Sequence, residues 1–155
     1  MFKGLFKKKS KFKSPMTGKM ILLENVLDPV FSTGTMGAGY AVDLSDGKVV
    51  APFDGEVVAC FPTGHAYGLK SNDDVEVLLH IGLDTVYLEG KGFDVKVKSG
   101  QKVNQGDVLV EVDLDILKQN NKSTVSPVIF TSGETVKVLK AGQDVSINDI
   151  DVVKY

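Results

Sequence analysis

Apolar and polar residues alternate along positions 75–86, which read VEVLLHIGLDTV. In a β-strand, successive side chains point to opposite faces of the sheet. The alternation therefore predicts a strand over Val75–Ile81 whose core face is formed by Val75, Val77, Leu79 and Ile81. Glu76, Leu78 and His80 lie on the opposite face, and Gly82 ends the run.

Short apolar runs separated by turn residues recur along the rest of the chain, which contains 16 glycines. This pattern predicts an all-β protein. The other expected strands are Lys19–Leu23, Tyr40–Asp43, Lys48–Ala51, Gly55–Phe61, Tyr67–Lys70, Val95–Val97, Asp107–Asp113, Val128–Phe130 and Thr135–Leu139. Asp46-Gly47 and Asp54-Gly55 are typical of hairpin turns. A helix is expected only at Leu114–Asn120, with two turns at most.

Two pairs of short segments resemble each other. Residues Ser14–Met20 (SPMTGKM) share with Ala51–Val57 (APFDGEV) a small residue, a proline, an apolar residue, a turn residue and a glycine in the same order. Residues Lys98–Val103 (KSGQKV) resemble Lys140–Val145 (KAGQDV), and an aspartate follows each of them four positions on. Each pair places a turn before a strand, which predicts a β-sandwich with internal quasi-symmetry.

Basic and acidic residues are unevenly distributed. All 18 basic residues are lysines, and six of them precede Ser14, where there is no acidic residue. From Ser14 onward the chain holds 12 lysines and 20 acidic residues, a net charge of −8. An acidic body argues against nucleic acid as the main partner. Without arginine, the chain cannot bind a phosphate through a bidentate guanidinium, and no G-x-x-x-x-G-K nucleotide loop occurs.

The length of 155 residues fits one domain, which we expect to cover residues 14–155. The basic segment 1–13 has two interpretations: a flexible, solvated tail, or a short amphipathic helix that binds an anionic membrane surface weakly. No apolar run approaches the roughly 18 residues of a membrane span, and no secretory signal is evident. The single cysteine, Cys60, fits a reducing compartment, so we expect a cytoplasmic protein.

The chain has two histidines, His80 and His65, the latter within the loop PTGHAYG. His80 can be interpreted as an ordinary surface imidazole satisfied by a hydrogen bond. Alternatively, a carbonyl near Gly82 could accept the proton of one ring nitrogen and leave the other nitrogen as a nucleophile. An unperturbed imidazole, with a pKa of about 6.5, is mostly neutral at pH 7 and able to attack.

A zinc site at His65 and His80 is a further interpretation. Catalytic zinc usually takes three protein ligands, and the chain offers no third histidine. Cys60 falls in an alternating strand and is expected to be a small core residue. A carboxylate from this chain or from a partner would have to complete the ligand set.

Five apolar residues lie near these motifs in the sequence: Phe31, Met36, Phe61, Leu78 and Val86. Each one alone is typical of a core. If several of them surround His80 outside the core, they form an exposed apolar patch of the kind that binds a protein partner.

Four segments of the sequence resemble one protein family: LLHIGLDTVYLEGKGF, PTGHAYGLKS, VAPFDGEVV, and GDVLVEVDL followed by KSTVSPV. They are similar to the glucose-family IIA component of the bacterial phosphoenolpyruvate-dependent sugar phosphotransferase system. The resemblance extends from about Ser14 to Tyr155. It implies an antiparallel β-sandwich with a duplicated, jelly-roll-like hybrid motif and short helices at most, in agreement with the repeats.

The resemblance also implies roles for individual residues. His80 would take a phosphoryl group on Nε2 from phospho-HPr and pass it to a cysteine of the IIB domain of a glucose-type sugar permease. His65 would remain unphosphorylated and support the transfer. Thr63 would form a hydrogen bond within the histidine pair, and the carbonyl of Gly82 would orient the phosphorylated ring.

Further residues are implied to bind partners. Asp28 and Asp84 would flank the site where an arginine of HPr approaches. The apolar docking ring would consist of Val30, Phe31, Phe61, Leu78 and Val86. The resemblance implies no required cofactor, although in some relatives the two histidines hold zinc when a partner donates a carboxylate. It also implies regulatory protein partners, and contact with the inner face of the membrane through residues 1–13.

Two alternatives to the phosphotransferase component remain open on the residues alone. A zinc-dependent peptidase on a similar fold would need a further histidine or aspartate in an H-x-H pairing, which the sequence lacks. A biotinyl or lipoyl carrier module is suggested by VKSGQKVNQGDVLVEVD, but no hairpin tip carries the lysine motif that such a carrier needs.

Overall fold

The computed structural model describes residues 11–155, which form an all-β fold with antiparallel strand pairing. The strands are β1 (Gly18–Leu22), β2 (Ala38–Leu44), β3 (Lys48–Val50), β4 (Gly55–Cys60), β5 (Ala66–Ser71), β6 (Glu76–His80), β7 (Phe93–Val95), β8 (Lys102–Val103), β9 (Val108–Val112), β10 (Val125–Phe130), β11 (Lys137–Val138), β12 (Asp144–Val145) and β13 (Val153–Lys154). The helices are α1 (Pro29–Ser32) and α2 (Leu114–Gln119), and Leu23–Asn25 and Thr85–Leu88 form 3₁₀ turns. The prediction of an all-β protein with short helices is confirmed.

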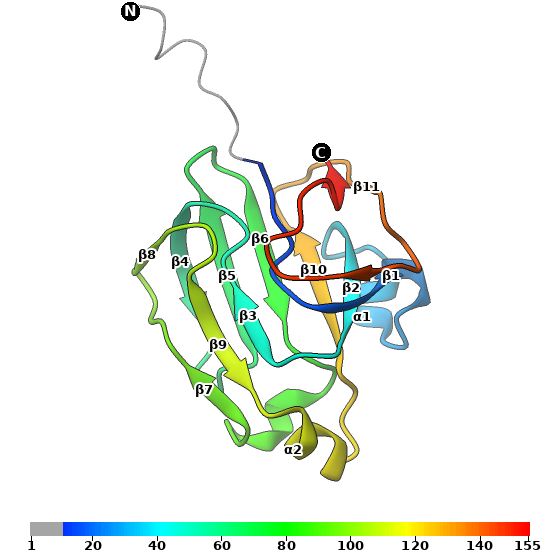
Figure 1. The fold of residues 1–155 in the computed structure, drawn as a ribbon, viewed down its shortest axis with the longest axis vertical. Coiled ribbons are helices and arrows are strands. Elements are labelled where there is room, and N and C mark those ends of the chain that lie inside the picture. Colours follow the sequence, from blue (N-terminus) through cyan, green and yellow to red (C-terminus); the bar gives the residue numbers. More distant parts are fainter. Residues whose placement is uncertain (1–10) are drawn as a thin grey trace, which may run out of the picture.

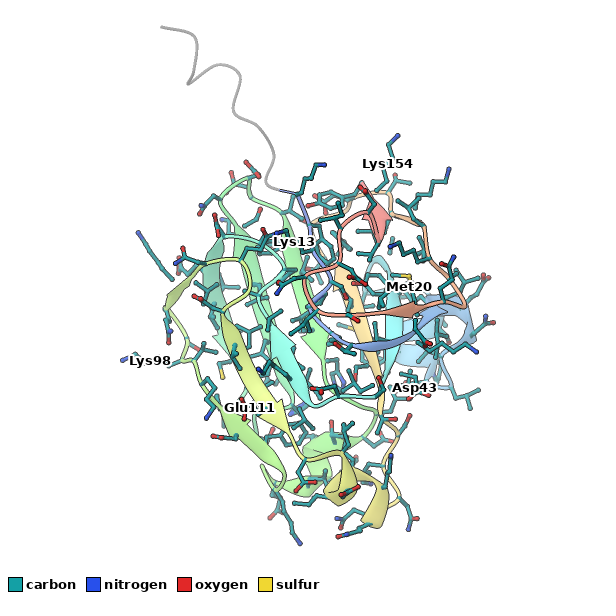
Figure 2. All side chains as sticks on the ribbon, viewed as in Figure 1. Lys13, Met20, Asp43, Lys98, Glu111 and Lys154 are labelled. Carbon is teal, nitrogen blue, oxygen red and sulfur yellow. The ribbon has the colours of Figure 1, made fainter. Side chains whose placement is uncertain are left out.

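Eleven of the strands build two layers that enclose one main core, and β11 and β13 pair separately. The larger sheet has the order β12-β1-β2-β10-β6-β5-β4-β8, and a smaller sheet has the order β3-β9-β7. Figure 1 shows β3 and β9 lying across the face of β4, β5 and β6. Side chains from both sheets, such as Leu69 and Leu79 from one and Val49 and Leu109 from the other, belong to the same buried cluster. Charged side chains such as those of Lys98 and Lys154 project outward (Figure 2). The molecule is therefore an antiparallel β-sandwich.

The two sequence repeats pair with each other in the same way. In β1 and β12, Gly18 is opposite Val145, and in β4 and β8, Gly55 is opposite Val103. Gly18 and Gly55 occupy the same position of the first repeat, and Val103 and Val145 the same position of the second. The quasi-symmetry predicted from the sequence is therefore visible in the strand pairing.

The aspartates that follow the second repeat also play equivalent parts. A carboxylate oxygen of Asp107 accepts a hydrogen bond from the backbone N–H of Asn104 at 2.8 Å. A carboxylate oxygen of Asp149 accepts one from the N–H of Ser146 at 2.8 Å. Each aspartate thus stabilises the turn that follows its repeat, because its side-chain oxygen accepts a hydrogen bond from a backbone N–H of that turn.

The two Asp-Gly pairs do not form hairpin turns, so this prediction is wrong. β2 and β3 lie in different sheets, as do β3 and β4. A Cβ at Gly47 would lie 1.9 Å from the carbonyl oxygen of Val112, and one at Gly55 would lie 2.1 Å from that of Lys70. Neither glycine has a positive φ. They are required for close backbone approach between strands rather than for a left-handed turn.

The expectation of one helix is also wrong, because α1 precedes the one predicted at residues 114–120. Its N-cap is Asp28, whose side chain accepts a hydrogen bond from the backbone N–H of Val30 at 3.0 Å. Pro29 occupies the first helical position, where it has no backbone donor to lose. The capping aspartate and the proline are sequence signals for this turn, but its four residues are too few for helical periodicity to appear.

The domain begins before the expected boundary at residue 14. Phe12 is 6% exposed and contacts the rings of Phe53, Phe130 and Tyr155, with centroid separations of 6.4, 5.4 and 6.2 Å. The backbone N–H of Lys13 donates to the carbonyl of Pro52 at 3.0 Å. Phe12 is therefore part of the core and not of a flexible tail.

We expect the substitution Phe12→Leu to lower the free energy of unfolding by about 1–2 kcal/mol, because it removes three aromatic contacts from a packed site. Lys11→Ala, at an exposed neighbouring position, should change it by less than about 0.5 kcal/mol. Urea unfolding of both variants measures the difference. Equal stability of Phe12→Leu and the unmodified chain would contradict the assignment of Phe12 to the core.

For the segment 1–13 the sequence predicts either a flexible tail or a membrane-binding helix, and residues 1–10 of it lie outside the described residues. Among residues 11–155, no helix has the length and apolar character that crossing a membrane requires.

Candidate functional site

The strand prediction around His80 is confirmed by the burial of alternate side chains. In and beside β6, Val75, Val77, Leu79 and Ile81 are 5%, 1%, 0% and 0% exposed. His80, on the other face, is half-buried at the end of the strand. The parity of the strand thus puts His80 outside the main core, at the surface of the larger sheet.

The second histidine reaches the same place through the hairpin of β5 and β6. The register of this hairpin places Ala66 opposite His80, so that His65 lies next to the end of β6. The backbone N–H of Ile81 donates to the carbonyl of His65 at 2.7 Å. The two imidazole rings are 5.1 Å apart between centroids and are nearly perpendicular, at 78°. Antiparallel pairing therefore brings together two histidines that are fifteen positions apart in the sequence.

One ring nitrogen of His80 is held by the backbone. His80 Nδ1 lies 2.7 Å from the carbonyl oxygen of Gly82. Because a carbonyl can only accept, Nδ1 must carry the proton, and the neutral ring therefore has a lone pair on Nε2. Gly82 has a φ of +71°, and a Cβ there would lie 2.6 Å from the carbonyl oxygen of Ser123. A glycine is required at this position for both reasons.

Thr63 and His65 form a second hydrogen bond, between the threonine hydroxyl and Nδ1 of the imidazole. His65 is 5% exposed, and the ring of Phe61 lies edge-on to it at 5.5 Å. Among the described residues, no hydrogen-bond partner contacts Nε2 of either histidine. The site thus has two oriented imidazoles whose Nε2 atoms are both available for chemistry.

Both imidazoles are biased towards the neutral form. Burial lowers the pKa of His80 below its ordinary value, and the hydrogen bond to Gly82 and the charges of Asp28 and Asp84 offset part of this lowering. Burial also lowers the pKa of His65, and the neighbouring His80 lowers it further. Because only a neutral imidazole has a lone pair to donate, the environment favours nucleophilic attack at neutral pH.

We expect both histidines to titrate below about pH 6.5, the ordinary midpoint for imidazole. Since the folded pKa is depressed, the unfolded chain binds more protons, and the free energy of unfolding should decrease as the pH falls through that value. An NMR titration of the imidazole signals gives the two midpoints directly. A midpoint for His80 at or above the ordinary value would show that the carboxylates outweigh burial.

Of the residues that the resemblance names as partner-binding, Asp28 and Asp84 act electrostatically on His80, and most of the apolar ones are at least partly exposed. Asp28 is half-buried and Asp84 exposed. Val30, Phe61 and Val86 are 54%, 43% and 42% exposed, and Leu78 is half-buried. Phe31 was expected in the docking ring but is 4% exposed, with its ring 5.0 Å from that of His80. It belongs to a buried cluster, and in this structure it packs beside the His80 ring from inside rather than forming part of the surface.

Sequence reasoning missed two exposed apolar residues that are adjacent in the sequence to expected partner-binding residues. Leu27, directly before Asp28, is 95% exposed, and Tyr87, directly after Val86, is 73% exposed. Their adjacency to two expected partner-binding residues was a usable signal. The Lys122 ammonium lies 5.4 Å from the centroid of the Tyr87 ring. The exposed apolar surface near the histidines is thus wider than predicted.

As a metal centre, the histidine pair offers two ligands. No group of three or more histidine, cysteine, aspartate or glutamate side chains is placed to hold a metal ion within residues 11–155. A catalytic zinc takes three protein ligands. The described part of the chain therefore does not complete a zinc site by itself.

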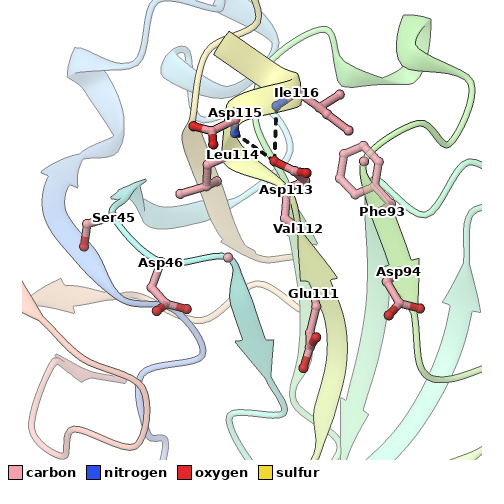
Figure 3. Close-up of a pocket in the computed structure, with 12 residues that line it drawn as sticks. Ser45, Asp46, Phe93, Asp94, Glu111, Val112, Asp113, Leu114, Asp115 and Ile116 are labelled. Carbon is pink, nitrogen blue, oxygen red and sulfur yellow. Dashed lines mark hydrogen bonds between the residues drawn. The ribbon is translucent and has the colours of Figure 1, made fainter. Parts of the chain in front are cut away.

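A separate open hollow of about 730 Å³ shares no lining residue with the histidine site (Figure 3). Two of the carboxylates that line it form local structural contacts. Asp113 caps α2 by accepting from the N–H groups of Asp115 and Ile116, and Asp94 pairs with Lys96 at 2.7 Å. The size of this hollow therefore does not make it the functional site.

Comparisons with known proteins identify the family of the chain. A sequence model of the family described as "phosphoenolpyruvate-dependent sugar phosphotransferase system, EIIA 1" matches residues 10–136. The chain is 41% identical to the glucose-specific EIIA component of Staphylococcus epidermidis over 159 residues, covering 99% of this chain and 92% of that protein. It is 46% identical over 127 residues to the component of the same name from Halalkalibacterium halodurans, covering 82% and 73%.

A solved structure is similar over nearly the whole fold. The glucose permease IIA from Mycoplasma capricolum superposes with a TM-score of 0.86 at 41% identity, covering 96% of this chain and 97% of that one. The family model, the relatives and the solved structure all indicate the same protein family. The chain belongs to the EIIA 1 family of the phosphoenolpyruvate-dependent sugar phosphotransferase system.

Proposed function

We propose that this protein is the phosphoryl carrier of a glucose-type sugar phosphotransferase system. His80 accepts a phosphoryl group from phospho-HPr and donates it to a cysteine of the IIB domain of the sugar permease. The observation that carries the proposal is the hydrogen bond from His80 Nδ1 to the Gly82 carbonyl, which leaves Nε2 as the nucleophile. The names of the relatives, glucose-specific EIIA components, support the choice of system.

The proposed reaction is two successive phosphoryl transfers. In the first, the lone pair of His80 Nε2 forms a bond to phosphorus while the bond from phosphorus to the donor residue of HPr breaks, and the donor keeps that electron pair. In the second, the cysteine thiolate of IIB forms a bond to phosphorus, and the P–Nε2 bond breaks to regenerate neutral His80. Throughout, the proton stays on Nδ1 and is donated in a hydrogen bond to the Gly82 carbonyl, so the ring neither turns nor changes its tautomer.

Transferring a phosphoryl group requires positive charge or hydrogen-bond donors around its oxygens. The chain has no arginine, and the charged residues flanking His80 are Asp28 and Asp84. We propose that the partner supplies a cation, which these two carboxylates attract. The same arrangement keeps the isolated phosphorylated protein from reacting with other acceptors, because the stabilising charge is missing until a partner binds.

Both partners would use the same surface, the apolar residues around the two histidines. Exposed Val30, Phe61 and Val86 can exclude water from the phosphoryl group once a partner is bound. Since one face must bind and release two unrelated proteins, each interface should be modest in area and short-lived. Both partners and this chain would meet in the cytoplasm.

Zinc at His65 and His80 is proposed only for complexes in which a partner donates a carboxylate. His80 and His65 would contribute their Nε2 atoms, which have no described partner. Zinc would then withdraw both imidazoles from phosphoryl transfer. The phosphoryl relay itself, as proposed, needs no cofactor.

The test of the proposal is the intact mass of the protein after incubation with phosphoenolpyruvate, Enzyme I and HPr. We expect a gain of one phosphoryl group that is labile in acid, as phosphohistidine is, and that disappears when a IIB domain is added. Omitting HPr gives the control. An unchanged mass in the complete mixture would overturn the proposed function.

A further inference from the structure

Gly82, whose carbonyl holds His80, is itself held by side chains from outside its strand. It follows β6 and has a φ of +71°, so it cannot be fixed by continuing the sheet. Two peptide units meet at this residue. The Ile81–Gly82 unit contains the carbonyl of Ile81 and the N–H of Gly82, and the next unit contains the carbonyl of Gly82 and the N–H of Leu83. All four polar groups are hydrogen-bonded.

Ser126 binds one end of the first peptide unit. Its side chain is 0% exposed, and Oγ lies 2.9 Å from the backbone nitrogen of Gly82. Because an N–H can only donate, the serine hydroxyl accepts here and directs its own proton to the carbonyl of Thr124, at 3.1 Å. The direction of both hydrogen bonds is thereby fixed. Ser126 lies in β10, 44 residues along the chain from Gly82.

Thr85 binds the other end of the same peptide unit. It is 0% exposed, and its hydroxyl donates to the carbonyl of Ile81. The Ile81–Gly82 peptide plane is therefore clamped at both ends by buried hydroxyls. The following unit is held by the N–H of Leu83, which donates to the carbonyl of Ser123 at 3.3 Å. Rotation of either plane would break these bonds in a place without water to replace them.

We propose that Ser126 and Thr85 are positioning residues, whose hydroxyls fix the Gly82 carbonyl and through it the Nδ1–H tautomer of His80. This inference rests on the proposed role of His80 as phosphoryl acceptor. Neither hydroxyl bonds to the imidazole, so neither is a catalytic residue. Without them, the Gly82 carbonyl is free to turn from Nδ1, and the imidazole then distributes its proton between both nitrogens. Each molecule with a proton on Nε2 is unable to attack.

The first test is the tautomer of His80, measured by long-range ¹H–¹⁵N NMR at a pH where the ring is neutral. We expect the unmodified protein to carry the proton on Nδ1. Ser126→Ala and Thr85→Val, of which the second preserves side-chain shape, should both show a mixture of tautomers. This measurement needs no phosphoryl donor, so it decides the positioning role even if phospho-HPr proves not to be the donor.

Ser71→Ala provides the matched control. Ser71 is 5% exposed, and its hydroxyl accepts from the N–H of Val75 at 3.1 Å, at the other end of the β5–β6 hairpin. It therefore removes a buried hydroxyl that binds the backbone of the same hairpin, far along both strands from His80. We expect this variant to lose stability but to leave the His80 tautomer unchanged. If Ser71→Ala changed the tautomer equally, the effect of Ser126→Ala would reflect a general loss of stability and not a specific hydrogen bond. That result would overturn the proposal.

The second test is the rate of phosphoryl acceptance in single-turnover experiments with phospho-HPr. We expect about a tenfold lower rate for Ser126→Ala and for Thr85→Val, the lower end of what losing such a supporting hydrogen bond costs. Ser126→Thr and Thr85→Ser keep the hydroxyl and should recover most of the rate. A normal tautomer and a normal rate in either Ala or Val variant would refute the role of that residue. If Ser126→Ala does not fold, Thr85→Val tests the clamp from its other end.

Discussion

Replacing His80 with alanine is expected to abolish phosphoryl acceptance from phospho-HPr completely. His80 has an Nε2 lone pair whose availability is fixed by the Gly82 carbonyl, and alanine has no nucleophile to replace it. The fold should persist, because His80 lies on the face of β6 opposite the buried Val77 and Leu79. The measurement is the intact mass after incubation with phosphoenolpyruvate, Enzyme I and HPr.

Glu76→Ala is the matched control for this experiment. Glu76 is half-buried and lies on the same face of β6 as His80, four residues away. It should accept the phosphoryl group as the unmodified protein does. A His80→Ala variant that folds and still gains an acid-labile phosphoryl group would place the acceptor elsewhere, and His65 would then be the first residue to examine.

The position of His80 could be predicted from the sequence because strand parity is a local property. The alternation over Val75–Ile81 required no knowledge of the partner strands, and its buried face is as expected. The loop PTGHAYG and the family resemblance added His65, whose contact with His80 depends on one hairpin register. Local pattern and a short hairpin therefore sufficed to place the two catalytic candidates.

The lysines around Phe12 predict a solvated tail, whereas the first repeat, extended backward, predicts a buried position for Phe12. Ser14 corresponds to Ala51 in the first repeat, and extending the repeat backward by two residues matches Phe12 to Val49. Val49 is fully buried, and Phe12 is 6% exposed. Internal symmetry here outweighs local charge, since each half of the sandwich needs an apolar side chain at this position.

Phe31, Ser126 and Thr85 could not be placed from the sequence in the same way. Whether Phe31 faces a partner or the core depends on how α1 packs on neighbouring strands, which no periodicity reveals for a four-residue helix. The hydrogen bond from Gly82, just after β6, to Ser126, in β10, joins residues that are 44 positions apart. Such a contact exists only because β6 and β10 are neighbours in the sheet, and that order is not visible in the sequence. The sequence indicates the two candidate reactive histidines, whereas the residues that hold them in place are found only in the tertiary structure.

Replacing His65 with glutamine is expected to separate the two half-reactions. His65 is held at Nδ1 by Thr63, and its ring centroid is 5.1 Å from that of His80. If the Thr63 hydroxyl donates to Nδ1, the proton of neutral His65 is on Nε2, from which it can bind an oxygen of the phosphoryl group on His80. This donor should matter most when a cysteine thiolate attacks, because two negative groups then meet.

We therefore expect His65→Gln to be phosphorylated on His80 at nearly the normal rate, because in the proposed relay HPr supplies its own cation. Transfer to IIB should be roughly a hundredfold slower. A lost donor to a transferring group costs on the order of 3 kcal/mol, which corresponds to that factor. Single-turnover assays of the two half-reactions on one preparation measure it. Equal losses in both halves would assign His65 a structural or zinc-binding role, and full activity in both would make it a bystander. Only an unequal loss fits a residue that stabilises the phosphoryl group during its departure.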